Sequence, residues 1–297
     1  MKNKFLFFLL LVPSLYGETK LIVLGSGTPN PDPYRAGSAY AVVVNETAYL
    51  VDFGPGVVRR AASLSPPWGG KVEAMNVKNL EHAFLTHIHS DHSAGLADLL
   101  LTPWIMGRER KLNLYGPSGL KKMASSILKA FEEDINYRIY GTQPSNNIGY
   151  KFNFNVLAEG IVYEDENISV EAFKVPHGSF DDAYGFRFTS SDKVIVFSGD
   201  TGPSKILEKF SSGADILVHE VYSHAGFLNK TKDWQTYHQG HHTSTFEVAE
   251  IASRAKPELL LLSHILFWGS TTEEILNEVS SKYDGQIKIA EDLMIIE

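Results

Sequence analysis

The chain of 297 residues has no cysteine. This absence excludes a disulfide bond, a cysteine nucleophile and a thiolate metal ligand. Any metal that the chain binds must therefore be held by nitrogen and oxygen atoms. Zinc suits such ligands, and manganese or iron would suit them as well.

Positive charge is also scarce. Lys and Arg number 27 against 35 Asp and Glu, which leaves a formal net charge of −8 at pH 7. A negatively charged surface repels the phosphates of DNA and RNA. We therefore expect no nucleic acid partner, although a local basic patch would override the net charge.

The apolar run at residues 5–12 is too short to span a bilayer comfortably. Lys2 and Lys4 flank it on one side, and Pro13 and Gly17 follow it, which is the pattern of a secretory signal peptide. We expect a signal peptide over residues 1–17, secretion to the periplasm, and no membrane span in the mature chain. A buried first strand and an uncleaved anchor remain alternatives.

Residues 18–297 contain no linker, low-complexity segment or repeat, so we expect one domain. Short runs rich in β-branched and other apolar residues predict strands, and longer periodic segments predict helices. The predicted strands are residues 20–24, 39–44, 49–53, 83–86, 112–115, 168–175, 184–189, 194–198, 215–218 and 259–262. The predicted helices are residues 57–63, 120–131, 246–254 and 273–282, with another that begins at Leu96. This order predicts an α/β (α+β) fold of two packed sheets with helices outside them.

Residues 86–92 are Thr-His-Ile-His-Ser-Asp-His, which places four potential metal ligands within six residues. His87 and His89 are two residues apart and would project to one side of an extended chain. Asp91 and His92 follow where a helix is predicted to start. Imidazoles and a carboxylate crowded in this way need a cation as their common partner, so the segment predicts a metal site.

Three further candidate ligands follow later strands. His177, Asp200 and His264 each lie at or just after the end of a predicted strand. Alone, each would more often be a cap or a hydrogen-bonded loop residue, but separate strand ends can converge on one site. Five His and two Asp exceed the three or four protein ligands of one catalytic zinc, so we expect two metal ions.

The order His-x-His-x-Asp-His, His, Asp, His resembles the metallo-β-lactamase superfamily, and within it the branch that contains ribonuclease Z and the secreted arylsulfatases. Further segments match that branch in order, namely residues 24–31, 51–54, 198–201, 218–220 and 242–245. The resemblance implies a four-layer αββα sandwich made of two mixed sheets flanked by helices.

The resemblance also implies two bound zinc ions, with Asp200 as the bridge between them. The ligands of the first ion would be His87, His89 and His177. The ligands of the second ion would be Asp91, His92 and His264.

The catalytic residues implied by the resemblance are Asp91, His242 and Glu220. His242 would donate a proton to the leaving group, because imidazole titrates near neutral pH, and Glu220 would orient it. For Glu220 and its neighbour His219, the alternative is a supporting role in the core. For His241, the alternative is that it is a mere neighbour of His242.

The substrate is predicted from departures within that branch. Ribonuclease Z has a phosphate-binding loop Pro-x-Lys-x-Arg-Asn; this chain keeps Arg35 but has Pro33 and Ala36 at the Lys and Asn positions. Only 22 residues separate His177 from Asp200, too few for the arm with which bacterial ribonuclease Z binds tRNA. We therefore expect a small anionic ester as substrate, and a sulfate ester above others.

Several alternatives to the sulfate ester remain open. The first is a phosphodiesterase acting on cyclic nucleotides or, like ribonuclease Z, on RNA. Lactone or β-lactam hydrolysis and metal binding without catalysis come after it. The sequence also leaves open whether the chain forms a homodimer.

Arg35, Trp104 and Trp268 are the predicted substrate-binding residues. Both tryptophans follow ligand-bearing segments and would line an aromatic pocket, although aromatic residues more often pack in the core. Residues 222–240 would be either a lid over the site or a surface loop.

Overall fold

The computed structural model describes residues 18–297. The predicted signal peptide, residues 1–17, lies outside the described residues, so export and periplasmic localisation stay predictions. Across residues 18–297, every helix is too short or too polar to cross a bilayer.

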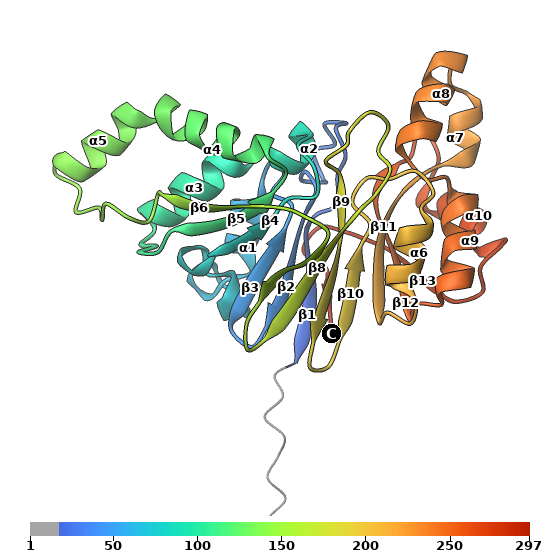
Figure 1. The fold of residues 1–297 in the computed structure, drawn as a ribbon, viewed down its shortest axis with the longest axis horizontal. Helices are drawn as coiled ribbons and strands as arrows, with labels where there is room; N and C mark the ends of the chain where they lie inside the picture. The colour runs from blue at the N-terminus through green and yellow to red at the C-terminus, as the bar shows by residue number, and fades with distance from the viewer. Residues whose placement is uncertain (1–17) are drawn as a thin grey trace, which may run out of the picture.

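Two seven-stranded mixed sheets lie face to face at the centre of the molecule (Figure 1). In the first sheet, the strands in spatial order are β14 (Ile295–Ile296), β1 (Thr19–Gly25), β2 (Ala39–Val44), β3 (Thr47–Val51), β4 (His82–Phe84), β5 (Leu112–Gly116) and β6 (Phe152–Val156). In the second sheet, they are β13 (Gln286–Ile289), β12 (Leu259–Leu266), β11 (Ile216–Tyr222), β10 (Val194–Phe197), β9 (Tyr184–Ser190), β8 (Ile168–Lys174) and β7 (Gly160–Glu164).

Helices cover the outer face of each sheet (Figure 1). Beside the first sheet lie α1 (Val57–Leu64), α3 (Leu96–Ile105), α4 (Gly119–Ala130) and α5 (Glu132–Tyr140), with short 3-10 turns at Pro66–Trp68, Glu73–Met75 and Val77–Asn79. Beside the second sheet lie α6 (Lys205–Ser211), α9 (Thr245–Ala255) and α10 (Thr272–Ser280). The single turn α2 (Ser90–Ser93) and the hairpin of α7 (His224–Leu228) and α8 (Lys232–His241) lie along the upper edge in Figure 1.

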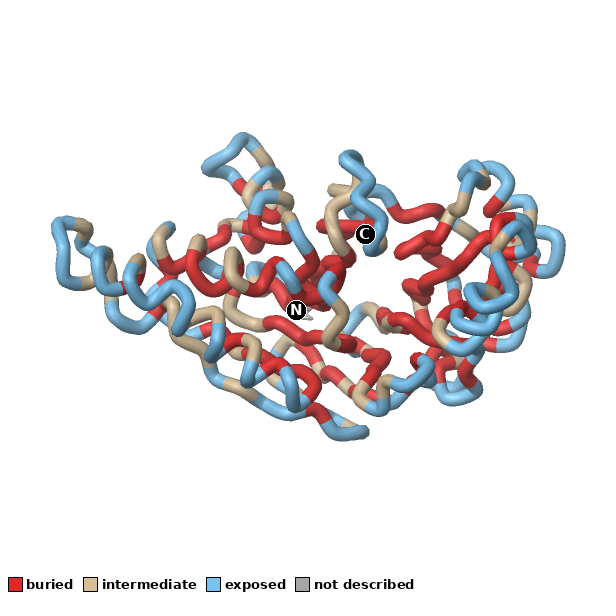
Figure 2. The backbone as a smooth tube through the Cα atoms, turned by 90° about the horizontal axis from the view of Figure 1, so that it is seen from above, coloured by how far each residue is buried: buried red, intermediate tan, exposed pale blue. Residues whose placement is uncertain are grey.

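Three hydrophobic clusters hold these layers together. Strand β1 contributes to two of these clusters, because successive side chains of a strand point to opposite faces. Leu21 and Val23 pack between the two sheets, whereas Ile22 and Leu24 pack in the cluster beneath α1 and α3. A third cluster lies between the second sheet and α6, α9 and α10. Figure 2 shows the resulting buried centre and exposed outer helices, and the predicted αββα sandwich is confirmed.

The strands that the sequence analysis missed are the four edge strands, β6, β7, β13 and β14. An edge strand is half-exposed, so its apolar pattern is weak; β6 has no fully buried residue. The segment at residues 222–240, left open as a lid or a surface loop, contains the helical hairpin α7–α8.

Arg108 is a fully buried guanidinium that closes the turn after α3. It donates five hydrogen bonds to four backbone carbonyls, those of Leu80, Leu99, Leu100 and Gly149, at 2.9–3.1 Å. Substitution Arg108→Met would leave these carbonyls buried without that donor, and each such loss costs about 1–3 kcal/mol. We expect the free energy of unfolding to fall by about 3–5 kcal/mol, as measured by urea denaturation.

Arg110→Met is the matched control for this variant. The side chain of Arg110 is 78% exposed and makes one ion pair, with Glu81 at 3.1 Å. Exposed ion pairs contribute about 0–1 kcal/mol, so the control should unfold at nearly the wild-type urea concentration. Equal losses in the two variants would show that the buried guanidinium is not what holds this turn.

Candidate active site

The His-rich segment lies between β4 and α3. His87 and His89 occupy the extended turn after β4, and the single helical turn α2 carries Asp91 and His92. Gly54 allows the loop after β3 to pack against this turn, because a Cβ at that position would overlap the carbonyl oxygen of Asp91. The first sheet thus presents all four side chains from one short, tightly supported segment.

The second sheet supplies the other candidate ligands. His177 follows β8, and Asp200 follows β10, as predicted. His264 instead lies within β12, where the pairing with β11 shifts by one residue. His264 is the extra residue of this β-bulge and has a positive φ of 46°. Bulges redirect side chains, and this one directs His264 toward Asp91 and Asp200.

The candidate ligand atoms form two adjacent groups, each with its atoms within 4.8 Å of one another. The first group is His87, His89, His177 and Asp200, and the second is Asp91, His92 and His264. In the first group, Nδ1 of His89 lies 2.9 Å from Nε2 of His87 and 3.2 Å from Nε2 of His177. In the second group, Nε2 of His264 lies 2.9 Å from Oδ2 of Asp91.

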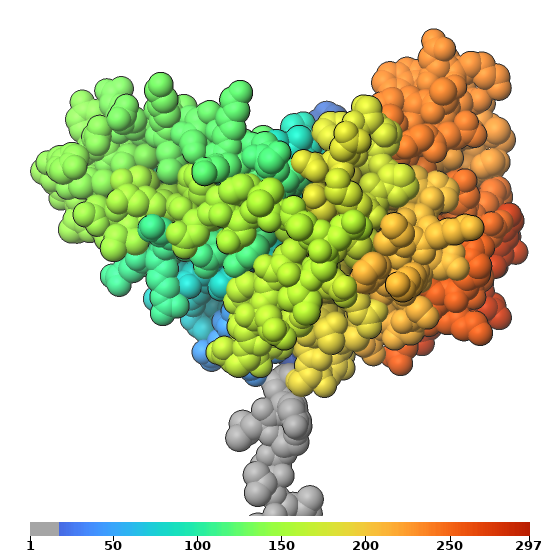
Figure 3. All heavy atoms as spheres, in the orientation of Figure 1, coloured from blue at the N-terminus to red at the C-terminus, as the bar shows by residue number. Residues whose placement is uncertain are grey.

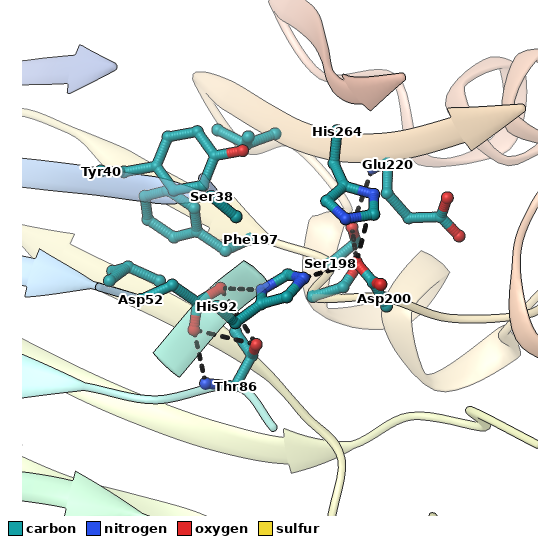
Figure 4. A pocket seen from close by; sticks show the side chains of 13 residues that line it. Ser38, Tyr40, Asp52, Thr86, His92, Phe197, Ser198, Asp200, Glu220 and His264 are labelled. Carbon is teal, nitrogen blue, oxygen red and sulfur yellow. Dashed lines mark hydrogen bonds and ion pairs between the residues drawn. The ribbon is translucent and has the colours of Figure 1, made fainter. Parts of the chain in front are cut away.

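Asp200 lies between the two groups, and Figure 4 shows it beside His92 and His264 of the second group. Its Oδ2 is 3.8 Å from Nε2 of His87, and its Oδ1 is 3.4 Å from Nε2 of His92 and 3.5 Å from Nδ1 of His264. This carboxylate therefore contacts imidazoles of both groups. All seven predicted ligands come together, four from the first sheet and three from the second.

Several of these atoms test whether the site fits a metal. Among the described residues, no hydrogen-bond partner exists for Oδ1 of Asp91, Nε2 of His92, Oδ1 of Asp200 and Nδ1 of His264. Buried polar atoms almost always have a partner. A cation would be the missing partner of these atoms, so the His and Asp cluster fits a metal site; its chemistry does not select one metal over another.

Asp52, to which the sequence analysis assigned no role, holds the side chain of His92. Nδ1 of His92 donates to its Oδ2 at 2.7 Å, and the backbone N–H and hydroxyl of Thr86 donate to its Oδ1 at 2.8 and 2.9 Å (Figure 4). Similarly, Nδ1 of His177 donates to the carbonyl of His241 at 2.8 Å. Such partners fix which nitrogen of an imidazole faces the metal. Residues 51–54, which match the ribonuclease Z branch, were the sequence feature that could have identified Asp52.

The electrostatics of the cluster suit metal binding. Burial lowers the pKa of His87 well below its usual value and lowers the pKa of His177 to about 4, so both imidazoles are neutral at pH 7. Burial opposes ionisation of Asp200, but His264 and His92 hold the pKa of this carboxyl well below its usual value. Neutral imidazoles and an ionised carboxylate are the forms that bind a metal. His92 and His264, whose pKa values Asp200 raises against the effect of burial, would release their protons when a metal binds.

His242 and Glu220 lie directly beside Asp200. Nδ1 of His242, the residue that ends α8, is 3.3 Å from Oε2 of Glu220 and 4.0 Å from Oδ2 of Asp200. The other oxygen of Glu220 accepts the backbone N–H of Thr243 at 2.9 Å, which holds the carboxyl in place. Burial lowers the pKa of His242 to about 4 and raises that of Glu220 well above its usual value. The predicted proton donor thus lies beside both a carboxyl group and Asp200 of the metal-ligating groups.

The two neighbouring histidines do not join the cluster. His219 is buried in β11, and its Nδ1 donates to the carbonyl of Glu220 at 2.6 Å. Nδ1 of His241 donates to the carbonyl of Tyr237 at 2.7 Å. Neither residue belongs to a metal-ligating group.

Two of the three predicted substrate-binding residues line cavities beside the site, and the third is buried in the core. Trp268 shares a cavity with His242, and Arg35 lines a second cavity that reaches Asp91. The prediction for Trp104 is wrong: its side chain is 1% exposed, and its indole N–H donates to the carbonyl of Asn146. Trp104 lies four residues after Leu100 on the buried face of α3, so it packs in the core instead of facing the site.

Comparison with known proteins places this geometry in a family. Residues 47–265 match the family described as the beta-lactamase superfamily domain. Ribonuclease Z of Mycolicibacterium gilvum is 30% identical over 288 residues, which cover 92% of this chain and 94% of that protein.

Solved structures share the fold. The metallo-beta-lactamase fold protein YhfI of Bacillus subtilis superimposes with a TM-score of 0.70 at 19% identity, over 94% of this chain and 98% of that one. The short form of human tRNase Z superimposes with a TM-score of 0.68 at 20% identity, again over 94% and 98%.

These relatives correct two predictions. A sulfate ester as the main substrate is wrong, because the relatives matched over most of this chain are ribonucleases. The expectation of a small ester substrate and no nucleic acid partner is wrong for the same reason. Net charge is a sum over the whole chain and does not describe the surface next to the site, where Arg35, Arg59 and Arg60 line one cavity.

Proposed function

Because the chain belongs to the metallo-β-lactamase superfamily, as a metal-dependent hydrolase of ester bonds in the ribonuclease Z-like branch, we propose that it is a phosphodiesterase that cleaves RNA. The observation that carries the proposal is the position of Asp200. This carboxylate contacts histidines of both metal-ligating groups and lies 4.0 Å from His242. Metal ions beside a proton donor can hydrolyse a phosphodiester.

Two metal ions, which we propose to be zinc, would be held by the two groups of His and Asp side chains. Bound there, they would activate water for attack and offset the negative charge that develops on the phosphate. Asp52 and the carbonyl of His241 hold the imidazoles of His92 and His177 in the required orientation.

The protein's own contribution to bond cleavage is a proton. An alkoxide leaves poorly, so the ester oxygen must be protonated as its bond to phosphorus breaks. His242 supplies that proton from its ring, and the carboxyl of Glu220, 3.3 Å away, replaces it, because burial raises the pKa of this carboxyl and keeps the proton on it at rest.

The surface around the site supports a polymeric substrate. Figure 3 shows a hollow in the upper outline between the α4–α5 arm and the α7–α8 hairpin, divided by the loop between β8 and β9, and α2 lies at the upper edge beside α4 in Figure 1. Arg59 of α1 lines a cavity that shares Arg35 with the cavity reaching Asp91, and Lys230 lines the cavity beside His242. Basic side chains in these positions can bind phosphates of a chain that crosses the hollow.

A direct comparison of substrates tests this proposal. We expect the zinc-loaded protein to cleave a tRNA with a 3′ extension at one position and to hydrolyse bis(p-nitrophenyl) phosphate, with both activities lost on chelation and regained with zinc. p-Nitrophenyl sulfate should be hydrolysed far more slowly. An Asp200→Asn preparation, purified identically, controls for contaminating nucleases. Intact tRNA alongside rapid hydrolysis of the small phosphodiester would refute the RNA proposal.

A further inference from the structure

The cavity that Trp268 shares with His242 has none of the seven metal ligands in its lining. It has a volume of about 370 Å³ and is lined by Pro29, Asn30, Lys230, Trp234, Tyr237, His238, His242, Leu266 and Trp268. Its walls come from the loop after β1, the α7–α8 hairpin and the end of β12. Binding cavities for small organic groups begin at about this size. The cavity and the reaction centre share one side chain, that of His242.

Aromatic rings dominate these walls. The centroid of the His238 ring lies 4.4 Å from that of the Trp268 ring and 5.6 Å from that of the Trp234 ring, with interplanar angles of 53° and 22°. Trp234 is 54% exposed and Tyr237 39%, so both still offer ring surface to a ligand. Such ring faces favour a flat aromatic occupant.

The backbone holds Trp268 in this position. Its φ is 46°, a conformation that a bulky side chain seldom adopts. Gly226 in α7 permits it, because a Cβ there would lie 2.9 Å from the Cβ of Trp268. Residues held in uncommon backbone conformations cluster at ligand-binding sites.

Two polar groups give the cavity further specificity. His238 is only 9% exposed, and its Nδ1 has no hydrogen-bond partner within residues 18–297. Nζ of Lys230 lies over the ring of Trp268, 4.6 Å from its centroid. A nucleotide would satisfy both groups, because the edge of its base forms hydrogen bonds and its phosphate carries negative charge.

We propose that this aromatic cavity binds the unpaired base of the nucleotide that carries the leaving oxygen. The side of the bond follows from His242, which protonates the leaving oxygen and also lines the cavity. The base lies against Trp234 and Trp268, its edge faces His238, and Lys230 binds a neighbouring phosphate. The inference rests on the proposed RNA cleavage and adds a position at which the base is recognised.

The test compares two RNAs and four proteins. The RNAs are identical apart from the nucleotide on the leaving side of the cleaved bond, which carries its base in one and is abasic in the other; the product ends identify that side. The proteins are wild type, Trp234→Ala, Trp234→Phe and Trp68→Ala. Trp68 is 71% exposed and lies after α1, outside the cavity, so its variant is the matched control.

Stacking of a base on an aromatic side chain is worth about 1–3 kcal/mol, or about 5-fold to 150-fold. We expect wild type to cleave the abasic RNA with kcat/KM lower by a factor in this range. Trp234→Ala should lose the same factor on the intact RNA and nothing further on the abasic RNA. Trp234→Phe should keep most of the difference in kcat/KM between the intact and the abasic RNA, and Trp68→Ala should match wild type on both.

Two results would overturn the inference in different ways. If wild type cleaves both RNAs equally well, or Trp234→Ala slows both equally, RNA cleavage stands and the base-binding cavity is refuted. If wild type cleaves neither RNA, the proposed function is refuted and the cavity loses its assigned ligand with it.

Discussion

Asp200→Asn is expected to abolish hydrolysis and to lower the occupancy of both metals. Asp200 is the only described carboxylate that contacts imidazoles of both groups, at 3.8 Å from His87, 3.4 Å from His92 and 3.5 Å from His264. Asparagine keeps the shape of the side chain but removes the negative charge that would offset two cations. The loss of activity should be larger than about 10–100-fold, which is typical when a residue that only supports a metal ligand is replaced.

The measurements are metal content per chain by elemental analysis and hydrolysis of bis(p-nitrophenyl) phosphate. Asp98→Asn is the matched control. Asp98 is a half-buried carboxylate of α3 that accepts a hydrogen bond from the hydroxyl of Thr102, and it belongs to neither metal-ligating group. It should keep wild-type metal content and activity. An Asp200→Asn protein that retains two metals, or that stays active with one, would contradict a shared carboxylate.

His242→Gln is expected to keep both metals while slowing hydrolysis by about 10²–10⁴-fold, the usual contribution of a general acid. His242 is outside the seven-ligand cluster but lies 4.0 Å from Asp200. The loss should grow as the leaving group becomes more basic, because a poor leaving group depends most on the proton. Nitrophenyl esters should therefore lose least, and RNA or alkyl esters most.

A series of aryl and alkyl phosphodiesters provides the measurement, with metal content determined on the same preparation. His241→Gln is the matched control: the side chain of His241 donates a hydrogen bond to the carbonyl of Tyr237 at 2.7 Å, and the backbone carbonyl that holds His177 is kept in this variant. A uniform loss across the series, or a missing metal, would assign His242 to substrate positioning or metal binding instead.

The metal ligands were predictable because the information is local. Four of them lie within residues 87–92, and the chemistry of crowded imidazoles and carboxylates requires no knowledge of the fold. The other three were found from their places at strand ends. His264 proved to be a bulge residue inside β12, which no local pattern reveals, because a bulge is defined by the register of two paired strands.

The substrate-binding residues were harder to predict because aromatic side chains pack equally well in cores and pockets. Trp104 has the spacing of a core residue, four positions after Leu100, and its burial could have been expected from that. Trp268 faces a cavity only because its backbone is left-handed and α7 packs closely at Gly226. These features arise from contacts between distant segments.

Local sequence patterns were enough to predict two packed sheets with helices outside them, to exclude thiolate chemistry and to find the set of metal-ligating side chains. These depend on residue type, short-range spacing and alternating burial, all of which act over a few positions. Tertiary structure decided which side chains surround the reaction centre. It placed Asp52 behind His92, Glu220 beside His242, and the rings of Trp234 and Trp268 around one cavity. It also gathered basic residues near the site of an acidic protein, because only the folded chain sets the distances on which local electrostatics depends.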